Sequence, residues 1–149
     1  MIIVTMESLN YQNKPEERIR QAWIQTMIQD LGYPKQWIAI EKELSSLPHL
    51  SLIPKKELPK RRVDILVFAP HLHPDYPLYP LLMIECKVAP LEPKFAHQVL
   101  GYNTYVQAPF IALANQQEIL VGTFDAGANL TRFMRGLPSF KDLLHRISK

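Results

Sequence analysis

The sequence contains few of the residues that build disulfides, zinc sites and phosphate-binding loops. Its 149 residues include one cysteine, Cys86, and five glycines. A single cysteine excludes an intramolecular disulfide and a zinc site built from several thiolates, and it fits a reducing cytoplasm. No stretch follows the pattern G-x-x-x-x-G-K-[ST], which the phosphate-binding loop of an NTPase requires. We therefore do not expect ATP-driven work from this chain.

Long apolar runs are also absent, so no membrane partner is expected. The opening Met1–Met6 is apolar, but it is short, lacks a basic start and is followed by polar residues, which argues against a signal peptide. With 47% apolar and 21% charged residues, the chain is too apolar for a disordered protein. Its length suits one well-buried domain spanning 1–149. A net charge of +3 permits contact with nucleic acid without requiring it.

Thirteen prolines separate the apolar segments of the chain and make its elements easy to delimit. Helices are predicted over 15–31, 95–105 and 139–147, and strands over 37–44, 62–68, 80–88, 110–114 and 119–124. We expect 45–60 to form an exposed connection. We also expect 69–79, which holds three prolines, to form a rigid turn too long for a tight hairpin. This order predicts an α/β or α+β fold with a central mixed sheet of four to five strands flanked by helices.

Two acidic residues interrupt strands that are otherwise apolar. Asp64 and Glu85 each need a partner, because an ionised carboxylate is costly in an apolar interior. Two carboxylates at neighbouring strand ends would suit Mg²⁺ or Mn²⁺, and Lys87 shares a strand face with Glu85, where its ammonium could orient a water or stabilise a phosphate. The alternative is structural: Asp64 pairs with Arg61, Arg62 or Lys87, and Glu85 forms a salt bridge. Residue types alone leave both open.

The spacing Glu-x-Lys is a weak signal by itself. The chain contains it twice, as Glu85-Cys86-Lys87 and as Glu92-Pro93-Lys94. The second copy lies in a segment broken by proline, whereas the first ends a buried strand. Only the first is therefore a candidate site.

Five ordered segments carry a family resemblance. They are Glu16–Gln21, Leu31–Pro34, Arg61–Ile65, Ile84–Lys87 and Tyr102–Asn103. Together they resemble the N-terminal nuclease domain of type I restriction enzyme R subunits, within the PD-(D/E)xK nuclease superfamily. Gln98 and Tyr102 match the Q-x-x-x-Y motif of the exonuclease-like branch of that superfamily. The resemblance covers about residues 14–125 and implies a restriction-endonuclease-like core.

The resemblance also implies roles for individual residues. Asp64 and Glu85 would bind Mg²⁺, or Mn²⁺, with the Cys86 carbonyl as a further ligand, and Lys87 would be the catalytic lysine. Glu17 would be a helix-borne acid near the metal, although acids at this position also simply stabilise a helix N-terminus. The remaining two residues would support the lysine or contact DNA: Gln98 and Tyr102. Val63 replaces the proline of the superfamily name, at a position that only shapes the strand.

The R subunits that the chain resembles also carry a helicase-like motor, for which 149 residues leave no room. We therefore expect no ATP-dependent restriction, but a metal-dependent nuclease that hydrolyses phosphodiester bonds in DNA. Lys60, Arg61 and Arg62 adjoin Asp64 and could follow the phosphate backbone, or could simply be solvated. Two rivals stay open: a non-catalytic DNA-binding or assembly module, and a nuclease subunit that acts only with a motor or specificity partner. No pattern decides whether the chain forms a homodimer.

Overall fold

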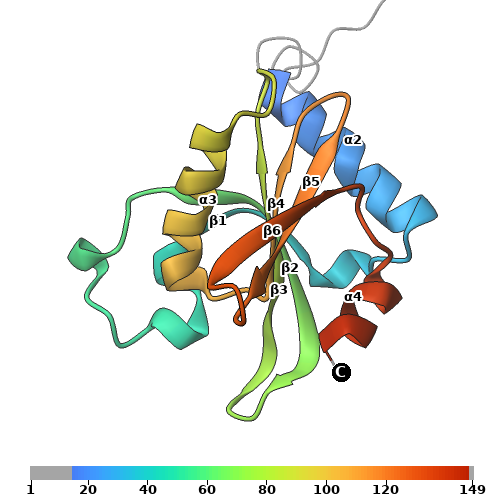
Figure 1. Ribbon diagram of the computed structural model, residues 1–149. Helices are drawn as coiled ribbons and strands as arrows, with labels where there is room; N and C mark the ends of the chain where they lie inside the picture. Colours follow the sequence, from blue (N-terminus) through green and yellow to red (C-terminus); the bar gives the residue numbers. More distant parts are fainter. Residues whose placement is uncertain (1–14, 148–149) are drawn as a thin grey trace, which may run out of the picture.

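A six-stranded mixed sheet forms the centre of the computed structural model, which describes residues 15–147 (Figure 1). The opening Met1–Met6 lies outside the described residues. The strands are β1 (Ile38–Glu43), β2 (Arg62–His73), β3 (Tyr76–Cys86), β4 (Phe110–Ala114), β5 (Ile119–Asp125) and β6 (Leu130–Arg135), and they lie in the sheet in this order. Neighbouring strands are antiparallel, except for the parallel pair β3 and β4. The α+β class predicted from the sequence is confirmed, with a somewhat larger sheet.

Helices cover both faces of this sheet. The α-helices are α2 (Pro15–Asp30), α3 (Pro93–Val106) and α4 (Phe140–Ile147), and four short 3-10 helices are η1 (Lys35–Trp37), η2 (Leu44–Ser46), η3 (Pro48–Leu50) and η4 (Lys55–Glu57). One apolar cluster packs α2 and α4 against the sheet, and a second packs α3 and the segment from η2 to η4 against it (Figure 1). Within residues 15–147, no helix is long and apolar enough to cross a membrane.

Local sequence signals set the ends of α2 and α3. Helix α2 begins with Pro15 and two acids, which suit the first turn of a helix, and the chain turns after it at Gly32, whose φ of +71° favours glycine. Helix α3 begins with Pro93 and ends at Gln107 in a left-handed conformation. The Asn103 amide then exchanges two hydrogen bonds with the backbone of Ala108. This amide fastens the end of α3 to the start of β4.

The prediction of a rigid turn over 69–79 is wrong. Strands β2 and β3 continue through this segment and leave only Pro74 and Asp75 as the turn of a long hairpin. Strand β1 pairs with β2 only as far as Val67, and β4 pairs with β3 only from Leu82. The hairpin beyond these points is paired only with itself, so each of its strands has a free edge. Proline is tolerated there because its missing N–H need not serve a neighbour, and the register shifts absorb the irregularity.

The segment 45–60 is less exposed than the sequence predicts. Its leucines Leu47, Leu50 and Leu58 are buried and join the cluster that α3 forms with the sheet. Its lysines Lys55, Lys56 and Lys60 are exposed. The segment therefore lies next to α3 and covers the same face of the sheet. Its buried leucines fix the chain just before the start of β2.

Strand β6 is missing from the sequence prediction. It is an edge strand, and its residues alternate between half-buried and exposed positions. Thr131, Arg132 and Arg135 interrupt its apolar pattern. The half-buried Phe133 packs against the cluster that contains α3. Edge strands need only one weakly apolar face, so this strand lacks the periodic signal of the central ones.

Candidate active site

The residues singled out in the sequence gather at one end of the sheet. This end holds the start of β2, the end of β3 and the N-termini of α2 and α3, whereas the β2–β3 hairpin extends from the opposite end (Figure 1). The antiparallel pair Ile65 and Ile84 places Asp64 next to Glu85 across the two strands. Lys87 follows directly after the last residue of β3, and its backbone N–H donates to Ala114 O at 2.8 Å. Strand pairing alone therefore assembles the central residues.

Asp64 and Glu85 form a coupled carboxyl pair. Asp64 Oδ2 accepts a hydrogen bond from the Cys86 backbone N–H at 2.8 Å, and Glu85 is only 3% exposed. Burial, followed by the charge of Asp64 and a hydrogen bond with it, raises the pKa of Glu85 to about 9, although Arg61 and Lys87 oppose this shift. Without a bound cation, Glu85 therefore keeps its proton at neutral pH.

The carboxyl pair fits a divalent metal ion. Glu85 Oε1 is buried and has no hydrogen-bond partner among residues 15–147, and its neighbour Asp64 supplies a second hard oxygen. A cation would satisfy this oxygen and remove the repulsion between the two carboxylates. Burial raises the pKa of the Cys86 thiol, so only the carbonyl of Cys86 suits such a metal. No group of three acidic, histidine or cysteine side chains able to hold a metal occurs in the described part of the chain. Water or substrate would complete the ligand set.

Helix α3 presents two polar residues to this centre. Gln98 Oε1 accepts a hydrogen bond from Lys87 Nζ at 3.2 Å. One turn later, the Tyr102 hydroxyl accepts from Arg61 Nη1 at 2.8 Å, and the Arg61 guanidinium lies 5.0 Å from the centre of the Tyr102 ring. Arg61 Nη2 also lies 3.9 Å from Glu85 Oε2. The spacing of four residues therefore places Gln98 on the lysine and Tyr102 on the arginine that faces the carboxyl pair.

A buried arginine on α2 connects Glu17 to the centre. Arg20 is 5% exposed and pairs with Glu17, with Glu41 at 3.2 Å and with Asp64 Oδ1 at 4.0 Å. Glu41 belongs to β1, where its φ of +50° departs from the extended backbone on either side. The sequence analysis assigned no role to Arg20 or to Glu41. The signal for Arg20 was present, because it lies seven residues before the buried Met27 on the apolar face of the helix.

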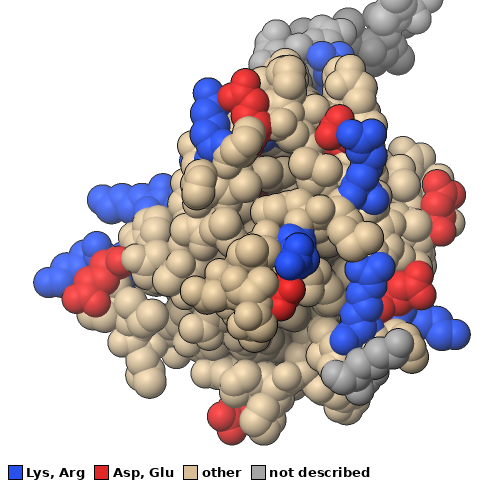
Figure 2. All heavy atoms as spheres, in the orientation of Figure 1, with Lys and Arg blue, Asp and Glu red and all other residues tan. Residues whose placement is uncertain are grey.

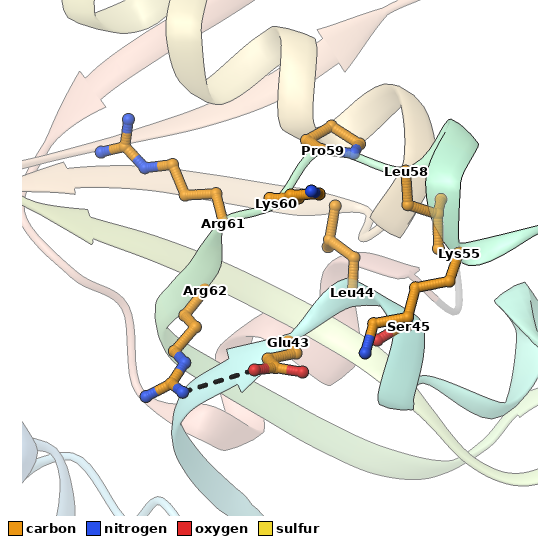
Figure 3. Close-up of a pocket in the computed structure, with 9 residues that line it drawn as sticks. All are labelled: Glu43, Leu44, Ser45, Lys55, Leu58, Pro59, Lys60, Arg61 and Arg62. Atoms are coloured by element: carbon orange, nitrogen blue, oxygen red, sulfur yellow. Dashed lines mark hydrogen bonds and ion pairs between the residues drawn. The ribbon is translucent and has the colours of Figure 1, made fainter.

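One cavity borders the carboxyl pair at Asp64, and a second is connected to the pair through Arg61. The first, of about 370 Å³, is lined by Pro15, Val88, Arg20 and four acids: Glu16, Glu17, Glu41 and Asp64. The other, of about 650 Å³, lies between the start of β2 and the segment that carries η4, and it includes four basic residues: Lys55, Lys60, Arg61 and Arg62. Figure 3 shows Arg61 and Arg62 on one side of this cavity and Lys55 on the other, with Arg62 paired to Glu43 at 3.3 Å. We call this second cavity the basic pocket.

The face drawn in Figure 2 shows no continuous basic surface. On the face drawn in Figure 2, lysine and arginine side chains stand singly or next to acids and do not merge into a continuous basic area. The basic pocket is distinguished by its position, because Arg61 contributes both to it and to the carboxyl pair.

Comparison with known proteins shows the family of the chain. The family described as Type I restriction enzyme R protein N terminus matches residues 15–138, which include every site residue described above. No curated protein and no solved structure matches the chain significantly. Because the match covers most of the sequence, the chain belongs to the family of the type I restriction enzyme R protein N terminus.

Proposed function

We propose that this protein is a metal-dependent nuclease that hydrolyses phosphodiester bonds in DNA. One observation carries the proposal: the buried Glu85 and the half-buried Asp64 form a carboxyl pair at the end of the sheet, with the Lys87 ammonium next to it on Gln98. An unsatisfied carboxyl oxygen is costly and persists where it has a function. The chain belongs to a restriction-enzyme family, which supports a nuclease function for this site.

The carboxyl pair would hold the metal. Asp64, Glu85 and the Cys86 carbonyl would bind Mg²⁺ or Mn²⁺, which lowers the pKa of a bound water and offsets charge on the phosphate. Glu17 would act at a distance from this metal, because Arg20 stands between it and Asp64. The binding of a cation would replace the proton that the pair carries without one.

The lysine and the basic side chains would act on the DNA. The Lys87 ammonium would donate hydrogen bonds to the attacking water and to an oxygen of the scissile phosphate, where negative charge develops. Arg61 would turn from Glu85 and Tyr102 to a neighbouring phosphate, and Lys60 and Arg62 would contact the backbone at the basic pocket. These contacts set position and carry no base specificity.

A second candidate function has support from the family. The matching family describes the N terminus of an R protein, so this chain would act as a nuclease subunit that cuts only with a motor or specificity partner. In that case, the isolated chain would bind metal through the same carboxyl pair but would cut poorly. A non-catalytic DNA-binding module would need no metal at all.

The deciding experiment is the cleavage of labelled linear and circular DNA with Mg²⁺, Mn²⁺ or EDTA. We expect metal-dependent cutting that falls at least about 100-fold in Asp64→Ala, which loses a metal ligand, and in Lys87→Ala, which loses the ammonium at the reacting phosphate. The matched control is Lys94→Ala, from the second Glu-x-Lys, where Lys94 pairs with Glu92 at 3.3 Å. It should cut like the parent.

Calorimetric titration with Mg²⁺ separates the remaining alternatives. A folded parent that binds Mg²⁺ but does not cut supports the partner-dependent subunit. A folded parent that neither binds Mg²⁺ nor cuts supports the non-catalytic module. Undiminished cutting by Lys87→Ala contradicts the proposed mechanism.

A further inference from the structure

Two uncharged groups of α3 hold the lysine of the site. Lys87 Nζ donates to Gln98 Oε1 at 3.2 Å and lies 5.0 Å from the centre of the Phe95 ring. Phe95 and Gln98 are three residues apart, so they project from one face of the helix. Phe95 is half-buried and packs against the apolar cluster beneath α3, which fixes its ring. The ammonium therefore rests on an aromatic face and an amide oxygen.

With these contacts made, the Lys87 ammonium forms no ion pair with Asp64 or Glu85. Lys87 lies two residues after Glu85, close enough for its charge to lower the pKa of that carboxyl group. Yet the ion pairs of residues 15–147 do not include Lys87, and the cation paired with Glu85 is Arg61. A lysine bonded to the carboxylates would occupy oxygens that a metal needs.

A lysine needs such support because its side chain is a flexible four-carbon stem. The face of an aromatic ring carries negative potential that attracts an ammonium within about 6 Å, without donating or accepting a proton. We propose that Phe95 is a positioning residue. Its ring and the Gln98 amide together hold the Lys87 ammonium next to the carboxyl pair, so that the ammonium forms no ion pair with these carboxylates. The inference rests on the proposed nuclease function.

The proposal predicts that the rate depends on the electron density of one ring. Phe95 is replaced site-specifically by phenylalanines with one, two or three ring fluorines, which weaken the negative face with little change in shape. The single-turnover cleavage rate at saturating DNA and Mg²⁺ should fall with each fluorine, whereas the melting temperature and the DNA affinity in EDTA should not change. Phe95→Leu should be roughly tenfold slower, and Phe95→Trp should stay within about twofold of the parent.

A matched control uses the second cation at the same ring. Lys94 Nζ lies 5.3 Å from the centre of the Phe95 ring, but its side chain pairs with Glu92. The variant Lys94→Ala should keep the parent rate throughout. A loss equal to that of Phe95→Leu would mean that local charge matters rather than the hold on Lys87, and it would overturn the proposal.

Nuclear magnetic resonance tests the contact without metal or DNA. The Phe95 ring should shift the ε-methylene signals of Lys87. These signals are assigned by their loss in a Lys87→Arg variant. Phe95→Leu should abolish the shift. Unchanged signals, or equal rates across the fluorinated series, overturn the proposal. If the parent itself does not cut, the proposal that the isolated chain is a nuclease fails, and the shift still decides whether Phe95 holds Lys87.

Discussion

A carboxyl group buried next to another carboxyl group keeps its proton well above the pH at which an exposed one loses it. Glu85 has this environment: it is 3% exposed, and the charge of the neighbouring Asp64 raises its pKa. Its pKa of about 9 in the folded protein compares with 4.5 for the unperturbed group. Between these values, the unfolded chain releases a proton that the folded chain retains. The stability of the metal-free protein is thereby linked to pH.

We predict that metal-free protein loses stability as the pH rises. Below about pH 4.5, Glu85 is protonated in both states and imposes no penalty. From there to about pH 9, ionisation favours the unfolded chain, because the unfolded state binds fewer protons. Between pH 5 and 8, the loss from this group is at most about 4 kcal/mol. Glu85→Gln should remove this contribution, as measured by urea unfolding in EDTA at both pH values.

The exposed Glu43→Gln is the control for this prediction. Glu43 makes an exposed hydrogen bond to Arg62, so its loss should leave the pH dependence of the parent unchanged. If the parent and Glu85→Gln lose equal stability between pH 5 and 8, Glu85 is not the group that retains the proton. Excess Mg²⁺ should flatten the curve of the parent, because a cation bound as proposed would take the place of the proton.

At the scale of secondary-structure elements, the sequence predicted those that carry strong periodicity. The central strands and the helices have it, and Asp64 and Glu85 stood out because they interrupt apolar runs. The hairpin was missed because the rule that proline breaks a strand ignores the free edges that tertiary pairing leaves. The roles of Arg20, Glu41 and Phe95 depend on contacts between elements far apart in the chain, and no local pattern encodes these contacts.

Two glycines in different elements should respond in opposite ways to replacement by alanine. In helix α3, a Cβ at Gly101 would meet no atom within 4 Å, so Gly101→Ala should stabilise the protein by about 0.5–1 kcal/mol. On β5, a Cβ at Gly122 would lie 2.8 Å from Phe133 Cε1 and 2.9 Å from Thr131 Cγ2. Gly122→Ala should therefore destabilise the protein by about 1–3 kcal/mol. Thermal unfolding gives the change in melting temperature of each variant. Changes of the same sign would contradict the packing of β5 against β6.

At the scale of the whole molecule, DNA binding should depend on salt through a few residues. A side chain that contacts a phosphate releases counterions, so Lys60→Ala and Arg61→Ala should each reduce the slope of log affinity against log salt by about 0.9. Fluorescence anisotropy with labelled duplex in EDTA measures this slope without cutting. The control is Lys141→Ala, on α4 and away from the basic pocket. Equal slopes for all variants would place the DNA elsewhere on the molecule.

The last helix also bears on the order in which the protein assembles during its synthesis. The Phe140 N–H donates to Leu31 O at 3.0 Å, and the Tyr33 hydroxyl donates to Pro138 O at 2.8 Å. Phe140 and Leu143 then complete the apolar cluster beneath α2. A growing chain that has reached residue 137 already contains Glu17, Asp64, Glu85, Lys87 and Tyr102. Its helix α2, however, still lacks part of the apolar surface against which it packs. We expect α2, and with it the contact of Arg20 to Asp64, to reach its final position only after α4 has emerged from the ribosome.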